Sequence, residues 1–460
     1  MRVKEKEGFS MKNQMTKSEV LFREKPVWTA IFSMAVPSCI TILVMVIYNM
    51  ADMFFIGQLG DTSQVAAISI VSPVFSLVTA VATMVGVGGC SVIANAAGAE
   101  RVEDAKTFAS LCCWASILFG IVAAFILLLG TNPILYLLGA NEEFIYYARI
   151  YMRILAFGAP FMLLSTVLAT VLRGDGAIKE GLIGNMVGTV LNIILDPVFI
   201  LVLHKGVAGA AVATVIGNMV SSIFYLRYII KKSAFLSISP RDAKRKPAAL
   251  LHIMAVGLPN GISSILSGFA STFSNQLLAG YGTNAIAAMA AAGKATMIIT
   301  MIQMGICMGT QPLMAYNYGA KNLPRLKEIL KKLGILSFVL GFAVTLVSFF
   351  ARHALIGMFL KDSGAAAMGE NLVIFLVIAS PVVGFYYLST NFLQASGNAL
   401  AATIVSVLRQ GILLIPGLYL MERLMGFTGI AAAHTAADAL SALIAVTVCI
   451  RQYRILKKTL

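Results

Sequence analysis

Long apolar runs dominate the chain, and charged residues or clusters of Gly, Pro and Asn separate them. An apolar run of about 20 residues is long enough to cross a bilayer as a helix. The runs are continuous and do not alternate in short segments, which excludes a membrane β-barrel. The pattern therefore predicts an all-α integral membrane protein. We expect twelve transmembrane helices, at residues 28–56, 64–90, 107–130, 152–172, 181–203, 207–230, 248–279, 284–315, 333–351, 371–395, 400–421 and 427–450.

The second half of the chain repeats the first. VPSCITILVMVIYNMADMFFIGQLGD, from Val36, aligns with LPNGISSILSGFASTFSNQLLAGYGT, from Leu258. NAAGAERVEDAK likewise aligns with YNYGAKNLPRLK, RGDGA with QASGN, and GVAGAAVATVIGN with GFTGIAAAHTAAD, all at offsets of 220 to 222 residues. Such a period indicates a tandem duplication of six spans. Because six is even, both halves enter the membrane from the same side, as in transporters that move one bundle against the other.

Polar and basic segments divide the duplicated chain. We expect a flexible cytoplasmic tail at 1–26, an N-terminal six-helix lobe at 27–230, a basic cytoplasmic linker at 231–247, a C-terminal six-helix lobe at 248–451 and a cytoplasmic tail at 452–460. A substrate would bind between the lobes. Several prolines lie within spans, and Pro37 and Pro259 occupy equivalent positions of the repeat. Each is either a hinge or a fixed kink required for packing.

Composition and charge agree with this assignment. Apolar residues make up 59% of the chain and charged residues 12%, whereas soluble domains carry about 25% charged residues. The net charge of +15 could indicate a nucleic-acid partner. With the N-terminus inside, however, 27 of the 35 basic residues fall on the cytoplasmic side and six on the outer side. This asymmetry predicts that both termini are cytoplasmic, and it explains the charge without nucleic acid.

Sequence signals for catalysis are missing. The four His residues are scattered, and the six Cys residues lie in apolar segments without metal-ligand spacing. The chain contains no Ser-His-Asp arrangement, Walker loop or selectivity-filter segment, so an enzyme and a channel are both disfavoured. We therefore expect no cofactor and no metal beyond Na⁺. Without an ATP-binding module, active transport must draw on a gradient of H⁺ or Na⁺.

Five ionisable residues fall well within the predicted spans: Asp52, Asp196, Asp438, Lys294 and Arg409. Because an unpaired charge is costly in hydrocarbon, each indicates either a functional site or a structural ion pair between helices.

Two of the acids share a helical face with oxygen-bearing side chains. These faces carry Tyr48, Asn49 and Asp52 in the first span, and Thr189, Asn192 and Asp196 in the fifth. Such oxygens suit a proton or a hard cation. Pro197 adds another oxygen, because its missing N–H leaves the carbonyl of Ile193 without a helical hydrogen bond. This carbonyl is either a ligand, or the helix simply kinks at the proline. The repeat partners of the two acids are Ser274 and Gly417, which favours a coupling-ion site confined to the N-terminal half.

The eighth span carries a soft face of methionines and glutamines, which includes Met301, Gln303 and Met304. Flexible thioethers suit multispecific binding, although such residues are also ordinary core and lipid-facing ones.

Four segments together resemble one known family. They are PSCITILVMVIYNMADMFFIGQLGD in the first span, LNIILDP in the fifth, QPLMAYNYGAKN after the eighth and LRQGILLIP in the eleventh. The likeness is to the multidrug and toxic compound extrusion (MATE) transporters, in particular their MepA-like bacterial branch, and it extends from about Pro26 to Arg451. It implies two six-helix lobes that form a V around a central cavity. It further implies export of small cationic amphiphilic molecules in exchange for H⁺ or Na⁺. We expect the protein to work as a monomer in the bacterial plasma membrane, surrounded by lipid, since the duplicated halves complete a transporter within one chain.

The resemblance also implies site residues. Its N-lobe proton or cation site falls on Asp52, Asn192, Asp196 and Thr214. From the helical faces and the proline positions, we expect Tyr48, Asn49, Thr189, Pro37 and Pro197 to support this site. Thr214 is added by the resemblance alone. Ion binding there is thought in the family to bend the first helix and release drug outward. Another branch carries acids in the seventh and tenth spans, where this chain has Ser274, Asn275, Gln276 and, at the outer edge, Glu370.

The remaining intramembrane charges match weaker family features. Arg409 and Asp438 occupy positions that are typically charged, and we expect them to form a structural pair. Lys294, Met301, Gln303 and Met304 are candidates for lining the cavity or gating it.

Two other functions compete with drug export. A flippase for lipid-linked oligosaccharides has a related fold, but it would need several bases in its cavity for pyrophosphate, and only Lys294 and Arg409 are available. A membrane enzyme acting on lipid head groups would need a catalytic constellation that the sequence lacks.

Overall fold

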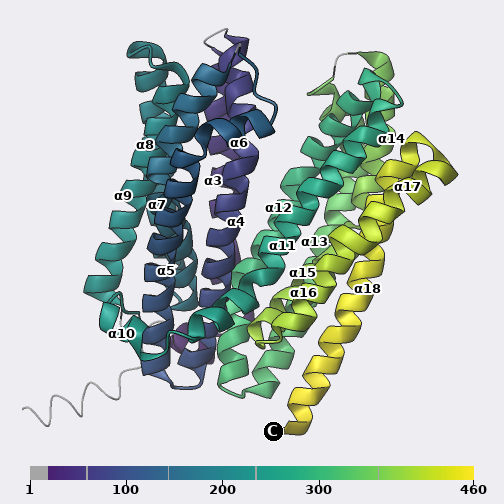
Figure 1. Ribbon diagram of the computed structural model, residues 1–460. Coiled ribbons are helices and arrows are strands. Elements are labelled where there is room, and N and C mark those ends of the chain that lie inside the picture. Colours follow the sequence, from purple (N-terminus) through teal and green to yellow (C-terminus); the bar gives the residue numbers. More distant parts are fainter. Residues whose placement is uncertain (1–18, 59–60, 143, 234–235, 361, 460) are drawn as a thin grey trace, which may run out of the picture.

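A computed structural model describes residues 19–58, 61–142, 144–233, 236–360 and 362–459, and within these residues every regular element is a helix. The helices form two bundles that lean apart as a V (Figure 1). Eleven helices in the described ranges are long and apolar enough to cross a membrane, and the pair α14 and α15 forms a twelfth, bent by 45°. The predicted all-α fold with twelve spans in two bundles is confirmed.

The N-terminal lobe contains six long helices, which surround its own apolar core. They are α3 (Val27–Gly57), α4 (Thr62–Gly98), α5 (Val102–Leu129), α7 (Ile145–Gly174), α8 (Ile178–Pro197) and α9 (Gly206–Lys232). Two short elements complete the lobe, α6 (Thr131–Leu137) and the π-helical turn η2 (Val198–Val202).

The C-terminal lobe repeats this plan, with two of its spans interrupted. Its elements are α11 (Ala249–Ala279), α12 (Thr283–Gly319), α13 (Leu323–Gly357), α14 (Ser363–Ile378), α15 (Ser380–Ala395), α16 (Ala399–Val407), the π-helical turn η3 (Leu408–Leu413), α17 (Leu414–Met425) and α18 (Phe427–Thr459). The tenth span, predicted as one run, bends between α14 and α15 directly before Pro381. Pro381 has no N–H to donate, so the helical hydrogen bonding is interrupted there.

The backbone itself repeats with the period of the sequence. Gly176 and Gly397, 221 residues apart, adopt left-handed φ angles of 76° and 74°. Glu100 and Lys321, also 221 apart, have φ angles of 58° and 57°. The two halves therefore turn between helices with the same local geometry.

The lobes meet at the narrow end of the V, where glycines let the backbones approach closely. At the crossing of α4 and α11, a Cβ added to Gly257 would lie 1.8 Å from the carbonyl oxygen of Met84. At the crossing of α4 and α12, a Cβ on Gly98 would lie 2.0 Å from the carbonyl oxygen of Tyr316. Both contacts exclude any larger residue unless the helices separate.

The end of the N-terminal tail is docked on the opposite lobe, although the sequence suggested a flexible segment. Residues Val20–Glu24 form a π-helical turn, η1, in which Phe22 is 1% exposed and packs on Tyr316 of α12 with ring centroids 5.1 Å apart. The carbonyl of Phe22 accepts hydrogen bonds from Arg325 Nε at 2.9 Å and Asn317 Nδ2 at 3.2 Å. The earlier part of the predicted tail, residues 1–18, lies outside the described residues.

The basic linker packs on the N-terminal lobe. Its short helix α10 (Pro240–Arg245) lies at the start of α5. Trp114 Nε1 donates to the Ile238 carbonyl at 3.1 Å, and Ser110 Oγ donates to the Ser239 carbonyl at 2.6 Å. Lys246 Nζ lies 2.6 Å from Asp104 Oδ1. The linker is thus attached to the N-terminal lobe by hydrogen bonds and an ion pair.

Candidate functional site

A cavity of about 730 Å³ lies between the two lobes, and side chains of both lobes line it. The N-terminal lobe contributes α3, α4, α7, α8 and α9, and the C-terminal lobe contributes α11, α12, α15, α16 and η3. Most of the polar lining is uncharged, made of hydroxyl and amide groups. Among the described lining residues the charged ones are Arg173 and Arg409. The wall is therefore polar and partly aromatic without being strongly charged.

The N-terminal wall of the cavity contains a cluster of oxygen-bearing side chains centred on Thr214. Thr214 Oγ1 lies 3.2 Å from the hydroxyl of Tyr48 on α3 and accepts a hydrogen bond from Asn192 Nδ2 at 3.5 Å. Asn192 is 3% exposed, and its Oδ1 accepts no hydrogen bond from any residue that the structure describes. One turn further along α8, Asp196 is fully buried. Of the predicted coupling residues, Asn192 and Thr214 are thus in contact, and Asp196 is buried one turn from Asn192.

Close packing of α8 on α9 creates this cluster. A Cβ added to Gly217 would lie 2.7 Å from the carbonyl oxygen of Gly188 and 3.2 Å from Asn192 Cβ. Because both glycines lack side chains, the two helices approach closely enough for Asn192 to reach Thr214.

Asn218, which was not among the residues predicted from the sequence, extends the cluster. Asn218 Nδ2 donates to the Thr214 carbonyl at 2.9 Å, and its Oδ1 accepts from Ser165 Oγ at 2.7 Å. Its position four residues after Thr214 was the available signal, since residues at this spacing share a helical face.

Pro197 ends α8 directly after Asp196, and the helix continues as the π-helical turn η2. Leu203 N donates to the Val198 carbonyl at 2.9 Å, which is the wider hydrogen bonding of a π-helix. π-helical turns are rare and frequently lie at functional sites. The proline thus coincides with an irregular helix beside the buried carboxyl.

The first span approaches the cluster through Tyr48. The side chains of Asp52 and Asn49 lie outside the described residues, so their predicted roles rest on the position of both residues in α3. Thr189 lines the central cavity. Pro37 is buried in the first half of α3, a helix that packs on α12.

The C-terminal wall holds a paired charge. Arg409 Nε lies 2.7 Å from Asp438 Oδ1 on α18. The guanidinium stands 4.5 Å from the ring centroid of Tyr386 and 5.3 Å from that of Tyr387. Arg409 belongs to η3, so each lobe places a π-helical turn next to an intramembrane charge. The predicted partners are brought together, and their charges compensate within the protein.

Several residues of the expected soft face lie elsewhere. Met304 lines the cavity, but Gln303 is 2% exposed and donates to the Ser380 carbonyl at 2.8 Å, between α12 and α15. One residue is about 100° of helical rotation, which turns Gln303 away from the face of Met304. Met301 is half-buried and Lys294 is exposed; neither lines the cavity.

Arg173, at the end of α7, is the lining base that the sequence analysis did not single out. Its Nη2 donates to Thr170 Oγ1 at 3.2 Å. The charge pattern of the sequence predicts Arg173 in a cytoplasmic loop, whereas its side chain reaches the cavity wall.

Two repeated bundles of membrane-spanning helices, with a polar cavity between them that both halves line, define a membrane transporter built from parallel repeats. The chain belongs to the MATE family of transporters. The sequence profile of that family, MatE, matches residues 37–198 and 259–420, one match in each lobe.

Relatives and solved structures agree with this assignment. The multidrug export protein MepA of Staphylococcus saprophyticus is 33% identical over 93% of this chain and 94% of its own length. MepA of Staphylococcus aureus strain MRSA252 is 32% identical with the same coverage. The outward-facing conformation of a multidrug resistance MATE family transporter matches with a TM-score of 0.91 and 25% identity, over 97% of this chain and 100% of that one. A MATE in complex with MaL6 matches equally well over 96% of this chain and all of the other. These relatives are transporters, consistent with the expectation that the chain is not an enzyme.

Proposed function

We propose that this chain exports small cationic amphiphilic molecules by antiport with H⁺ or Na⁺, alternating the access of its central cavity between the two sides of the membrane. Its MepA relatives are named as multidrug exporters. A lining that is mostly uncharged, polar and aromatic supports weak binding of varied compounds, because few charged groups dictate the shape of the substrate.

The observation that carries the proposal is the burial of Asp196, one helical turn after Asn192, which contacts Thr214. Burying an ionised carboxylate in a membrane protein costs several kcal/mol, and a proton or a bound cation lowers that cost. The neighbouring amide and hydroxyl oxygens are hard ligands of the kind that Na⁺ or a hydrated proton would use. Asp52 is the second acid of the proposed site, since it lies one turn beyond Tyr48 on α3.

The cluster also offers a mechanical link. Tyr48 on α3 contacts Thr214 on α9, so an ion held by Asp52, Asn192, Asp196 and Thr214 would draw α3 toward α8 and α9. Movement of α3 would change the wall of the central cavity, because Tyr48 is part of that wall. This reciprocal coupling is what antiport requires.

The orientation follows from the basic residues. With both termini in the cytoplasm of a bacterial cell, the narrow end of the V lies on the cytoplasmic side, since the C-terminus lies there (Figure 1). The V then opens outward, and the described conformation is the one that releases drug. We further propose that the protein works in the plasma membrane as a monomer, because both lobes of the transporter belong to one chain.

Ethidium efflux from proteoliposomes tests the proposal, with Na⁺ and pH gradients imposed separately. Wild type should follow one gradient, and Asp196→Asn should lose at least about 90% of that dependence while remaining folded, because a neutral amide cannot exchange a proton or hold a cation equally well. Glu370→Gln, which removes an acid that pairs with His353 at the surface, is the matched control and should retain efflux. Full gradient-driven efflux by Asp196→Asn would refute the proposed site.

A flippase for an anionic, lipid-linked substrate remains the competing function, because the charged side chains described in the cavity wall are both arginines. Arg409, however, is paired with Asp438, which leaves less positive charge than a pyrophosphate would need. If neither gradient drives ethidium efflux, translocation of a labelled anionic lipid becomes the decisive assay.

A further inference from the structure

A second cavity, of about 580 Å³, opens on the C-terminal lobe between α13, α15 and α18. Helix α15 separates it from the central cavity. Phe385, Leu388 and Ser389 line this groove, whereas Tyr386 and Thr390 of the same helix line the central cavity. The groove is therefore a distinct feature, on the other face of a helix that contributes to the transport pathway.

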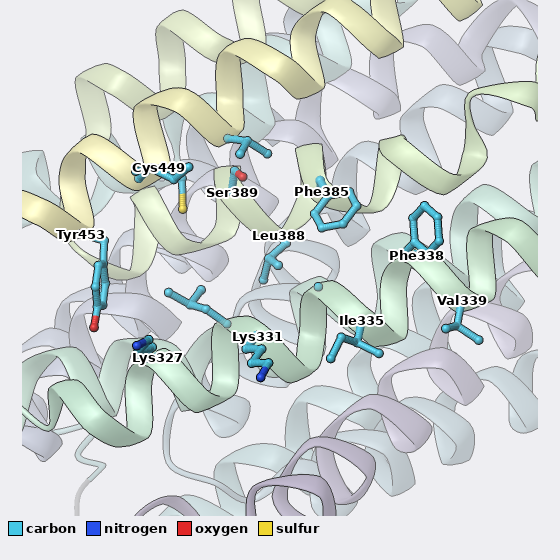
Figure 2. Close-up of a pocket in the computed structure, with 14 residues that line it drawn as sticks. Lys327, Lys331, Ile335, Phe338, Val339, Phe385, Leu388, Ser389, Cys449 and Tyr453 are labelled. Carbon is cyan, nitrogen blue, oxygen red and sulfur yellow. The ribbon is translucent and has the colours of Figure 1, made fainter.

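The body of the groove is apolar. Ile335, Phe338 and Val339 of α13 form one wall and remain 46%, 47% and 55% exposed. Gly334 leaves space in this wall, because a Cβ there would already lie 3.3 Å from Phe385 Cε1. Figure 2 shows Ile335, Phe338 and Val339 along α13, with Phe385 on the neighbouring helix.

One end of the groove is basic. Lys327 and Lys331 lie one helical turn apart at the start of α13, and both side chains are exposed. Figure 2 shows Lys327 beside Tyr453 of α18, and Lys331 further along α13, between Lys327 and Ile335. Neither lysine forms an ion pair with a residue in the described ranges. The adjacent acid Glu328 instead forms an ion pair with Lys332, with Oε1 and Nζ 2.5 Å apart.

The distance from the lysines to the far end of the apolar wall matches the thickness of one leaflet of a bilayer. At 1.5 Å per residue, Val339 lies about 12 Å along α13 from Lys331. One leaflet contributes roughly 15 Å of hydrocarbon, half of the bilayer core. A ligand that placed an anionic group at the lysines would therefore extend an apolar chain beside Ile335, Phe338 and Val339 at the proper depth.

We propose that this groove is a binding site for an anionic phospholipid, with the phosphate at Lys327 and Lys331 and one acyl chain along the apolar wall. The charge at the groove end repels a cationic drug and favours a negative headgroup over a zwitterionic one. The proposal concerns a structural ligand, and it holds whether or not the chain exports drugs. Because α15 contributes to both cavities, bound lipid would also stabilise the wall of the transport pathway.

Native mass spectrometry of the purified full-length protein, titrated with phosphatidylglycerol or phosphatidylcholine, tests the site. Wild type should retain one phosphatidylglycerol molecule in preference to phosphatidylcholine. Lys327→Gln combined with Lys331→Gln should lower that retention roughly tenfold, since each basic residue contributes to anionic lipid binding. The matched control is Lys231→Gln combined with Lys232→Gln, two exposed lysines at the end of α9, and it should retain the lipid.

Gly334→Leu tests the apolar wall of the groove independently of the two lysines. Leucine would fill the apolar wall, so this variant should lose phosphatidylglycerol while both lysines remain. If that variant fails to fold, the lysine pair alone decides the matter. Equal retention by the lysine variant and its control, or equal binding of the two lipids, would overturn the proposal. A protein dimer that excludes lipid would also overturn it, because the groove would then hold a second copy of the chain.

Discussion

Asp175 is a buried carboxyl outside the membrane-spanning helices, in the turn between α7 and α8. It is 9% exposed, and Oδ2 accepts a hydrogen bond from Ser233 Oγ at 2.9 Å. Burial raises the pKa of Asp175 from 3.8 to about 7, and the negative charge of Glu180 adds to the rise, while the Ser233 bond opposes it. The folded protein thus holds a proton that the unfolded chain releases at lower pH.

This difference predicts a pH-dependent effect of Asp175→Asn. A raised carboxyl pKa stabilises the folded state below about pH 4, and this stabilisation is lost as the pH rises to about 7. At 1.36 kcal/mol per pKa unit, the loss in the free energy of unfolding is up to roughly 4 kcal/mol. The amide stays neutral and can still accept from Ser233. In thermal unfolding from pH 4 to pH 8, the variant should therefore gain stability relative to wild type as the pH rises. A difference that stays constant across this range would contradict the assignment.

At the scale of helices, the crossing of α4 and α11 depends on the absence of side chains. A Cβ on Gly257 would lie 1.8 Å from a backbone oxygen, so Gly257→Ala should push the lobes apart at the narrow end and cost about 1–3 kcal/mol. Gly261→Ala is the matched control, because the nearest atoms to its Cβ lie 3.8 Å away. Thermal unfolding of the two variants compares them. Equal stability would mean that the crossing tolerates the added methyl group.

The docking of η1 predicts a change in proteolysis. Truncation of a buried Phe typically costs about 3–5 kcal/mol, so Phe22→Ala should release the segment and speed tryptic cleavage after Arg23 by at least about tenfold. Phe32→Ala, at a half-exposed position of α3, is the control and should be cleaved like wild type. If Phe22→Ala is cleaved no faster than wild type, the docking of η1 does not depend on the Phe22 side chain.

At the scale of the whole molecule, the sequence predicted the fold well because the bilayer leaves few alternatives. Apolar runs in water could fold in many ways, but in hydrocarbon they must form helices that satisfy their own hydrogen bonds. The repeat then predicted two bundles, and the family profile matches each half separately. Local breaks were harder to foresee: the bend before Pro381 and the π-helical turn at Arg409 depend on tertiary packing as well as on residue type.

Parts of the cavity wall could not be predicted from the sequence. Which side chains face the cavity depends on the rotation of each helix about its axis, and an error of one residue changes the answer. Met304 faces the cavity and Gln303 the neighbouring helix, although both belong to the same polar and sulfur-rich stretch. The pairing of Arg409 with Asp438 joins η3 and α18, a contact between different elements. The docking of Phe22 likewise joins the start of the chain to α12, and no local pattern in the sequence signals it.

In antiport, drug and ion move in opposite directions through one protein. The most direct test imposes an ethidium gradient across proteoliposomes without any ion gradient, while internal pH and ²²Na⁺ are followed. Because coupling is reciprocal, wild type should drive one ion against the drug, and Asp196→Asn should drive neither while still binding ethidium. Ethidium movement by wild type with no movement of either ion would rule out antiport.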